Sequence, residues 1–301
     1  MHNTKSMTIQ NPALFRPVPS LRRFLDTLYR QCDIRACING DPIEFPHRYT
    51  EPRDIETAGL IAAVLAYGRV DLFKQVIKRI LHRMGQSPAA FLADFSLRRD
   101  AKLFSGIYYR FNTTDDIVLF LHALHRIMKN HGSIENAFCR HMRPDASTVE
   151  DALAGFVAEV HAAAETKESR SRGFSQFFPS PANGSACKRL NLYLRWMVRQ
   201  AAPDFGIWRG IRADQLVIPL DLHISRIGRC FGLTTRKSDD WKTAVEITGS
   251  LKRFDPDDPL KYDFALCHLG ITQECRVDKC ASCRMPGAGK FGHQAARKRK
   301  K

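Results

Sequence analysis

The sequence lacks a long apolar segment and a recognisable export signal. Its Ala-rich apolar stretch, residues 57–68, is far shorter than the roughly 20 residues that cross a bilayer. The opening residues, MHNTKSMTIQNPALFRP, contain no apolar core of signal-peptide length. We therefore expect a cytoplasmic protein that does not associate with membranes.

Acidic residues are few relative to basic ones. The chain has 31 Asp and Glu against 47 Lys and Arg, a formal net charge of +16. The last twelve residues, KFGHQAARKRKK, carry six of these positive charges and no acid, but the rest of the chain is basic too. Such an excess favours a polyanionic partner, nucleic acid first. The alternative is charge that serves only solubility.

Alternating strand patterns and internal repeats are also absent, whereas apolar residues recur with helical period. The sequence therefore predicts an all-α fold. We expect helices at 20–32, 54–68, 71–85, 114–132, 148–165, 187–202, 221–232, 240–254 and 258–270, the last with Pro259 in its first turn. Loops are expected at 33–53, 86–113, 166–186 and 203–220, and a disordered basic tail at 286–301.

Nine cysteines are present, and they cluster near the C-terminus. In a reducing compartment, clustered thiols favour metal over disulfides. Cys280 and Cys283 form a C-x2-C pair, with Cys275 five residues upstream and Cys267 or His268 as a further candidate ligand. An iron–sulfur cluster, a zinc ion and a metal-free remnant remain alternatives.

Two segments carry residues suited to catalysis on DNA. Asp221 precedes an amphipathic helix with Arg226 and Arg229, where a carboxylate caps free backbone N–H groups. Lys188 follows the turn Asn183-Gly184-Ser185 at a helix start, a place that attracts phosphate. A lysine amine can attack a sugar carbon and form a Schiff base, and a nearby carboxylate can orient that amine or take its proton. A plain cap and a solvated surface lysine are the alternatives.

The segment VIPLDLHISRIGRCFGL, residues 217–233, resembles V-D-T-H-x-x-R-v-x-x-r-l-g-l of the helix-hairpin-helix DNA glycosylases, the superfamily of endonuclease III. The catalytic aspartate of that family falls on Asp221. FPSPANGSACKRL loosely resembles the hairpin L-P-G-V-G-x-K-T-A, whose catalytic lysine falls on Lys188. AGLIAAVLAYGRV and GIYYRFNTTDDIVLFLHALHRIMKNHGSI resemble further family segments in the same order. The resemblance covers residues 20–285, and the whole pattern is also similar to an uncharacterised bacterial family allied to the superfamily.

The chain departs from the family at several points. The hairpin has only the first of its two usual glycines, and Ala66-Tyr67-Gly68-Arg69 replaces a glutamine-bearing stretch that fills the gap left by a flipped base. The segment between Lys188 and Asp221 is longer than in endonuclease III, and more like the archaeal oxoguanine glycosylases. The family holds a [4Fe–4S] cluster with four cysteines, of which the last is missing here.

The resemblance implies a two-lobed fold with a DNA-binding cleft between the lobes. One lobe would hold residues 54–202, and the other residues 20–53 with 203–285. The implied function is a DNA base-excision glycosylase, with abasic-site lyase activity through Lys188 and with Asp221 as its partner. A non-catalytic nucleic-acid-binding protein, on DNA or on RNA, is the alternative.

The remaining site residues are assigned on the same basis. The expected partner is DNA, which places a monomeric protein at the nucleoid. Expected DNA contacts are Asn183, Gly184, Ser185, Arg69, Arg189 and Arg226; the expected base pocket is Tyr67, Trp196, Trp208 and His223; and the expected metal ligands are Cys267, Cys275, Cys280 and Cys283.

Overall fold

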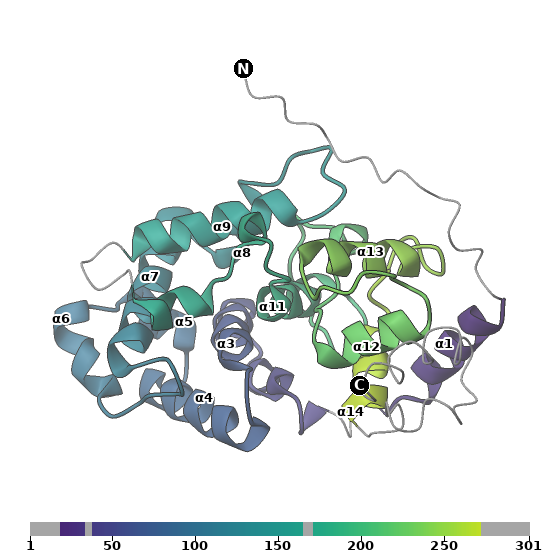
Figure 1. Ribbon diagram of the computed structural model, residues 1–301. Helices are drawn as coiled ribbons and strands as arrows, with labels where there is room; N and C mark the ends of the chain where they lie inside the picture. The colour runs from purple at the N-terminus through teal and green to yellow at the C-terminus, as the bar shows by residue number, and fades with distance from the viewer. Residues whose placement is uncertain (1–18, 34–37, 165–170, 272–301) are drawn as a thin grey trace, which may run out of the picture.

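The structure is a computed structural model that describes residues 19–33, 38–164 and 171–271. Over these ranges it is helical and contains no strand, only the isolated bridges Tyr109–Asn112 and Ser185–Asp240. The predicted all-α class is therefore confirmed (Figure 1). None of the helices in these ranges combines the length and the apolarity needed to cross a membrane.

Each helix expected from the apolar period overlaps a helix of the structure. These are α1 (Pro19–Gln31), α3 (Pro52–Leu65), α4 (Val70–Met84), α7 (Thr114–His131), α9 (Glu150–Ala163), α11 (Lys188–Val198), α12 (Leu222–Cys230), α13 (Trp241–Leu251) and α14 (Asp263–Ile271). The placement of Pro259 in a first helical turn was wrong. Residues 255–262 instead form turns, in which the Asp258 N–H donates to Asp255 at 3.1 Å.

Short helices occupy most of the segments expected to be loops. They are η1 (Pro42–Glu44), η2 (Pro46–Arg48), α5 (Pro88–Ala93), α6 (Leu97–Asp100), η3 (Ala101–Phe104), α10 (Arg172–Phe177), η5 (Pro181–Asn183) and η6 (Ala213–Gln215), and α8 (Ile134–Cys139) lies between two expected helices. Each is too short to show a helical period. Side-chain caps define several of them, because Ser87, Ser133 and Ser171 each accept from a backbone N–H three residues on.

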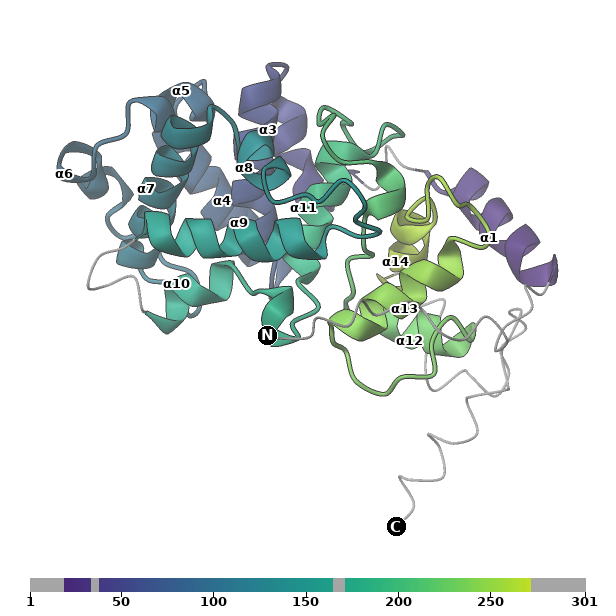
Figure 2. The same cartoon turned by 90° about the horizontal axis from the view of Figure 1, so that it is seen from above.

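Helices α3 and α11 pack against each other at the centre of the molecule. Twelve of the fourteen residues of α3 are buried. Gly59 lets the two helices approach closely, since a Cβ there would lie 3.0 Å from Met197 and 3.4 Å from Tyr193. Helices α4–α10 lie on one side of this central pair, and α1 with α12–α14 on the other (Figures 1 and 2).

Buried ion pairs tie α11 to the second group of helices. Arg195 pairs with Asp204 at 3.2 Å and with Asp263 of α14, and Arg199 pairs with Asp204 and Asp258, each at 2.8 Å. Both arginine side chains are at most 3% exposed. Because an unpaired buried charge is very costly, these pairs fix how α11 faces α14.

Candidate functional site

Asp221 is the N-cap of α12, as its sequence position predicts. Its Oδ1 accepts hydrogen bonds from the backbone N–H groups of His223 at 2.8 Å and Ile224 at 2.9 Å. Its Oδ2 lies 3.8 Å from the Sγ of Cys267 on α14. One carboxylate oxygen therefore caps the helix, and the other faces a different side of the site.

Lys188 is the first residue of α11 and is half-buried. The preceding turn contains two residues in the left-handed region, Gly184 at φ +75° and Cys187 at φ +49°. The Gly184 carbonyl accepts from the backbone N–H of Trp241 at 3.1 Å, which attaches this turn to the start of α13. Lys188 therefore begins α11 directly after a turn that is attached to the start of α13.

Asp221 and Lys188 both influence Cys267. Burial raises the pKa of the Cys267 thiol above its ordinary range; the charges of Asp221 and Asp263 raise this pKa further, and the charge of Lys188 lowers it. Asp263 precedes Cys267 by one turn on α14 and pairs with Arg195, which follows Lys188 by two turns on α11. The Arg195–Asp263 pair and the Asp221–Cys267 contact thus join α11, α12 and α14, the three helices that carry or begin beside Lys188, Asp221 and Cys267.

Three large apolar side chains are strongly exposed, and none of them was predicted from sequence to be a functional residue. Leu222, directly after Asp221, is 78% exposed. Tyr108 and Phe111 are 70% and 62% exposed, in a turn whose Arg110 has φ +53°. Leu222 could have been identified from sequence, because it lies about 200° around the helix from the buried Ile224. Nothing in the sequence distinguishes the exposed Tyr108 from a core aromatic.

This aromatic turn connects to Lys188 through Tyr67. The guanidinium of Arg110 lies 5.8 Å from the centre of the Tyr67 ring, and that of Arg189, the neighbour of Lys188, lies 5.0 Å from it. The Arg110 guanidinium also lies 5.6 Å from the Phe111 ring. Arginine and aromatic side chains thus gather around Tyr67, between the turn at Arg110 and the start of α11.

The predicted DNA contacts have different surroundings. Asn183 and Gly184 are exposed on the turn, and Ser185 and Arg226 are half-buried. Arg69 is exposed and pairs with Asp71 at 2.7 Å.

The prediction for Arg189 was wrong. Its largely buried guanidinium donates to the carbonyl oxygens of Val64 and Gln176, and burial lowers the pKa of Arg189 to about 10. Arg189 therefore joins α11 to α3 and does not project into solvent.

The predicted base pocket does not form as one cavity. Trp196 is fully buried in the core, so its assignment to a pocket was wrong. Trp208 is 2% exposed and donates to Glu56 at 2.9 Å. Tyr67 is half-buried and donates to the Tyr109 carbonyl at 3.1 Å, and His223 is half-buried beside Asp221. Of these four residues, His223 donates its backbone N–H to Asp221, and Tyr67 contacts Arg189, the residue after Lys188.

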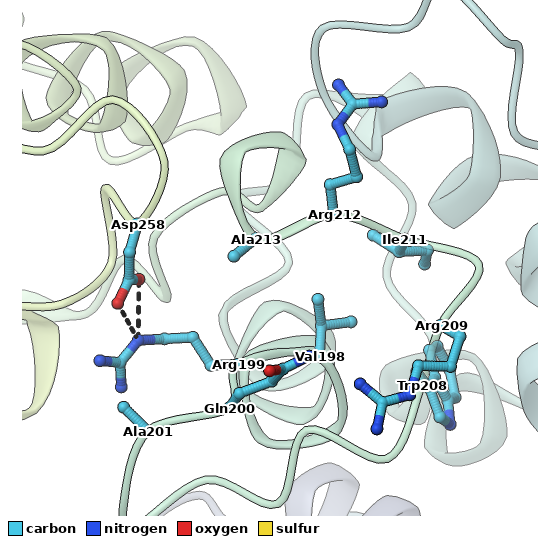
Figure 3. A pocket seen from close by; sticks show the side chains of 10 residues that line it. All are labelled: Val198, Arg199, Gln200, Ala201, Trp208, Arg209, Ile211, Arg212, Ala213 and Asp258. Carbon is cyan, nitrogen blue, oxygen red and sulfur yellow. Dashed lines mark hydrogen bonds and ion pairs between the residues drawn. The ribbon is translucent and has the colours of Figure 1, made fainter.

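A cavity of about 520 Å³ lies at the other end of α11. Figure 3 shows its lining, in which Arg199 points to Asp258 and Trp208 belongs to the opposite wall. Lys188 and Val198 are the two ends of an eleven-residue helix, which separates them by about 15 Å. The cavity is therefore distinct from the Lys188–Asp221 site.

Of the predicted metal ligands, only Cys267 lies within the described residues. Cys275, Cys280, Cys283 and the side chain of His268 lie outside them. The Sγ of Cys267 lies 3.8 Å from Oδ2 of Asp221. The described residues contain no group of three His, Cys, Asp or Glu side chains suited to a metal. The metal prediction for the four cysteines stays a prediction.

Three comparisons with known proteins complete the description. A family model described as "Protein of unknown function (DUF2400)" matches residues 41–272. The match includes Lys188, Asp221 and Cys267 and ends before Cys275. No curated protein and no solved structure matches the chain.

Proposed function

The chain belongs to the DUF2400 family, and from its site we propose that it is a DNA base-excision glycosylase with abasic-site lyase activity. The observation that carries the proposal is that Oδ2 of Asp221 is turned away from the helix cap toward Cys267, on which the charge of Lys188, 33 residues before Asp221 in sequence, also acts. A lysine amine beside a carboxylate with one uncapped oxygen is the minimum required for a Schiff-base reaction at a sugar carbon.

Each residue has a defined part in the proposed reaction. Oδ2 of Asp221 takes one proton from the Lys188 ammonium, while Oδ1 continues to cap α12. The neutral amine attacks C1′ of the flipped nucleotide, the C1′–base bond breaks, and the base leaves with its electron pair and takes up the proton held by Asp221. The attached nitrogen then loses a second proton to O4′ as the C1′–O4′ bond breaks, which leaves an iminium between Nζ and C1′, the intermediate from which a lyase cleaves the strand.

The surroundings of the pair support DNA as the substrate. Tyr108 and Phe111 are exposed aromatic side chains on either side of Arg110 in sequence, and the Arg110 guanidinium lies 5.6 Å from the Phe111 ring, a combination typical of surfaces that stack on nucleic acid bases. The turn 183–187 presents exposed backbone at the start of α11, where phosphate binds favourably. Helix groups on either side of α3 and α11 agree with the two-lobed helix-hairpin-helix architecture, which is part of this proposal.

Borohydride trapping tests the proposal. Wild-type protein, incubated with abasic or damaged duplexes and borohydride, is expected to form a covalent protein–DNA adduct, because borohydride reduces the iminium. Lys188→Gln should abolish the adduct and leave most DNA affinity, since one positive charge among many is lost. Lys102→Gln is the matched control, because it removes an exposed lysine on η3 in the other group of helices.

The partner role of Asp221 is tested in the same assay. Asp221→Asn should keep the cap, because the amide oxygen still accepts from His223 and Ile224, but should lower the trapping rate at least about 100-fold. If Asp221 acts only as a cap, Asp221→Asn traps normally and Asp221→Ala loses about 1 kcal/mol of stability. Trapping that persists in Lys188→Gln would refute the role of that lysine.

A non-catalytic nucleic-acid-binding protein is the alternative function. The missing second hairpin glycine, at Ala186, favours it, because the phosphate contact of the turn then differs from that of an active glycosylase. Wild-type protein that binds duplex DNA, but gives no adduct and no cleavage on any damaged oligonucleotide of a panel, would select this alternative.

A further inference from the structure

The second oxygen of Asp221 has a specific neighbour. Oδ1 is occupied by two backbone N–H donors, whereas Oδ2 lies 3.8 Å from Cys267 Sγ, within hydrogen-bond distance for a thiol. The orientation of Oδ2 therefore depends on a side chain from a different helix, α14.

Helix α14 holds this thiol in a fixed place. Asp263, one turn before Cys267, forms a buried ion pair with Arg195 of α11. Leu266 and Leu269, on either side of Cys267 in sequence, are 1% and 5% exposed. Neither rotation nor sliding of α14 is possible without breaking the ion pair or exposing these leucines.

The contact between the two side chains has a defined direction. A thiol S–H is a weak donor, whereas a carboxylate oxygen only accepts, so Cys267 Sγ donates to Oδ2 of Asp221.

We propose that Cys267 is a positioning residue for Asp221, whose Oδ2 accepts the Cys267 S–H and is thereby held in one orientation. The expected effect of Cys267 on the reaction rests on the proposed function. Its hydrogen bond to Asp221 rests on the observed contact alone. It gives Cys267 a role at the reacting site in place of the metal-ligand role that its sequence position suggested.

Trapping kinetics test the catalytic consequence. Cys267→Ala removes the donor, and the rate constant for borohydride trapping should fall about fivefold while the Kd for the duplex stays unchanged. Cys267→Ser keeps a donor and should recover most of the rate. Cys139→Ala is the matched control, because it truncates a half-buried thiol of α8 in the other group of helices. Equal rates for wild type and Cys267→Ala, or no recovery in Cys267→Ser, would overturn the proposal.

A double-mutant cycle tests the contact without any catalytic assay. In Asp221→Asn, the amide nitrogen that replaces Oδ2 no longer accepts the S–H. The unfolding equilibrium constant is measured for wild type, Asp221→Asn, Cys267→Ala and the double variant. The effect of the double substitution should differ from the product of the two single effects by at least about twofold. Additive effects would refute the contact. If wild-type protein traps no DNA, the proposed function fails and the cycle still decides whether Cys267 positions Asp221.

Metal analysis separates the proposal from a ligand role. Wild type and Cys267→Ser, both purified without oxygen, should contain the same amount of iron and zinc per chain. Loss of metal in Cys267→Ser would show that the thiol is a ligand and would overturn the proposal.

Discussion

Asp221 and Glu56 show how differently two carboxylates at helix starts can be used. Both oxygens of Glu56 are occupied: Oε2 accepts from Ile134 N at 3.2 Å, and Oε1 accepts from Glu135 N at 2.7 Å and Trp208 Nε1 at 2.9 Å. Asp221 gives its backbone donors only Oδ1. Glu56 is therefore fully used in joining α3, α8 and the segment after α11, whereas Oδ2 of Asp221 accepts only from the Cys267 thiol among the described residues.

The buried position of Glu56 predicts a pH-dependent stability. Burial raises the pKa of Glu56 to about 7, although its three N–H donors lower it. The native state thus holds this proton more tightly than the unfolded state, where the pKa is about 4.5. The free energy of unfolding should therefore fall as pH rises from about 4.5 to 7, by at most about 3 kcal/mol from this group.

Urea unfolding at a series of pH values measures this effect. The glutamine of Glu56→Gln cannot titrate. The free energy of unfolding of wild type should therefore fall relative to that of the variant as pH rises through this range. Glu51→Gln, which neutralises an exposed acid just before α3, should give a curve parallel to that of wild type. A parallel curve for Glu56→Gln would contradict the assignment.

At the scale of elements, sequence period predicted the long helices but not the short ones. Helix α7 carries a capping box at Thr113 and Asp116 and ends at Gly132, so both of its ends are readable. Helices α5 and α8 have six residues each, and only their serine caps distinguish them from loops. The pairing of Lys188 with Asp221 stays a prediction from the resemblance. The contact of Cys267 with Asp221 was not predicted, because it depends on how α14 packs against α12.

The turn before α11 gives a test at this scale. Gly184 has φ +75° and ends η5, and no atom lies within 4 Å of where its Cβ would be. Gly184→Ala should therefore destabilise by about 1 kcal/mol through backbone strain alone. Gly249 of α13 also has free space for a Cβ but lies inside a helix, so Gly249→Ala should stabilise by about 1 kcal/mol. Thermal melts that shift in the same direction would contradict the assigned turn conformation.

Across the whole molecule, buried and exposed arginines have separate functions. Arg195 and Arg199 lie at the contact between α11 and the second helix group, each paired with two aspartates. These four ion pairs neutralise the positive charge of the two buried arginines. The net charge of +16 therefore resides mainly in surface lysines and arginines and in the segment 290–301. The buried ion pairs of Arg195 and Arg199 fix how α11 faces α14, and the surface lysines and arginines are available to bind a polyanion.

This external charge predicts binding that depends steeply on salt. If about six phosphates are neutralised, log K for duplex DNA should fall with log salt concentration at a slope of roughly −5, because condensed counterions are released. A variant lacking 290–301 loses six positive charges and no acid, so its slope should be flatter, while its trapping rate at low salt should stay close to that of wild type. Fluorescence anisotropy over a series of salt concentrations measures both slopes, and matching thermal melts show that the deletion leaves the fold intact. An affinity that does not change with salt would mean that the basic surface does not contact a nucleic acid backbone. An unchanged slope after the deletion would place the contact on the helical body, beside Lys188 and the exposed Tyr108 and Phe111.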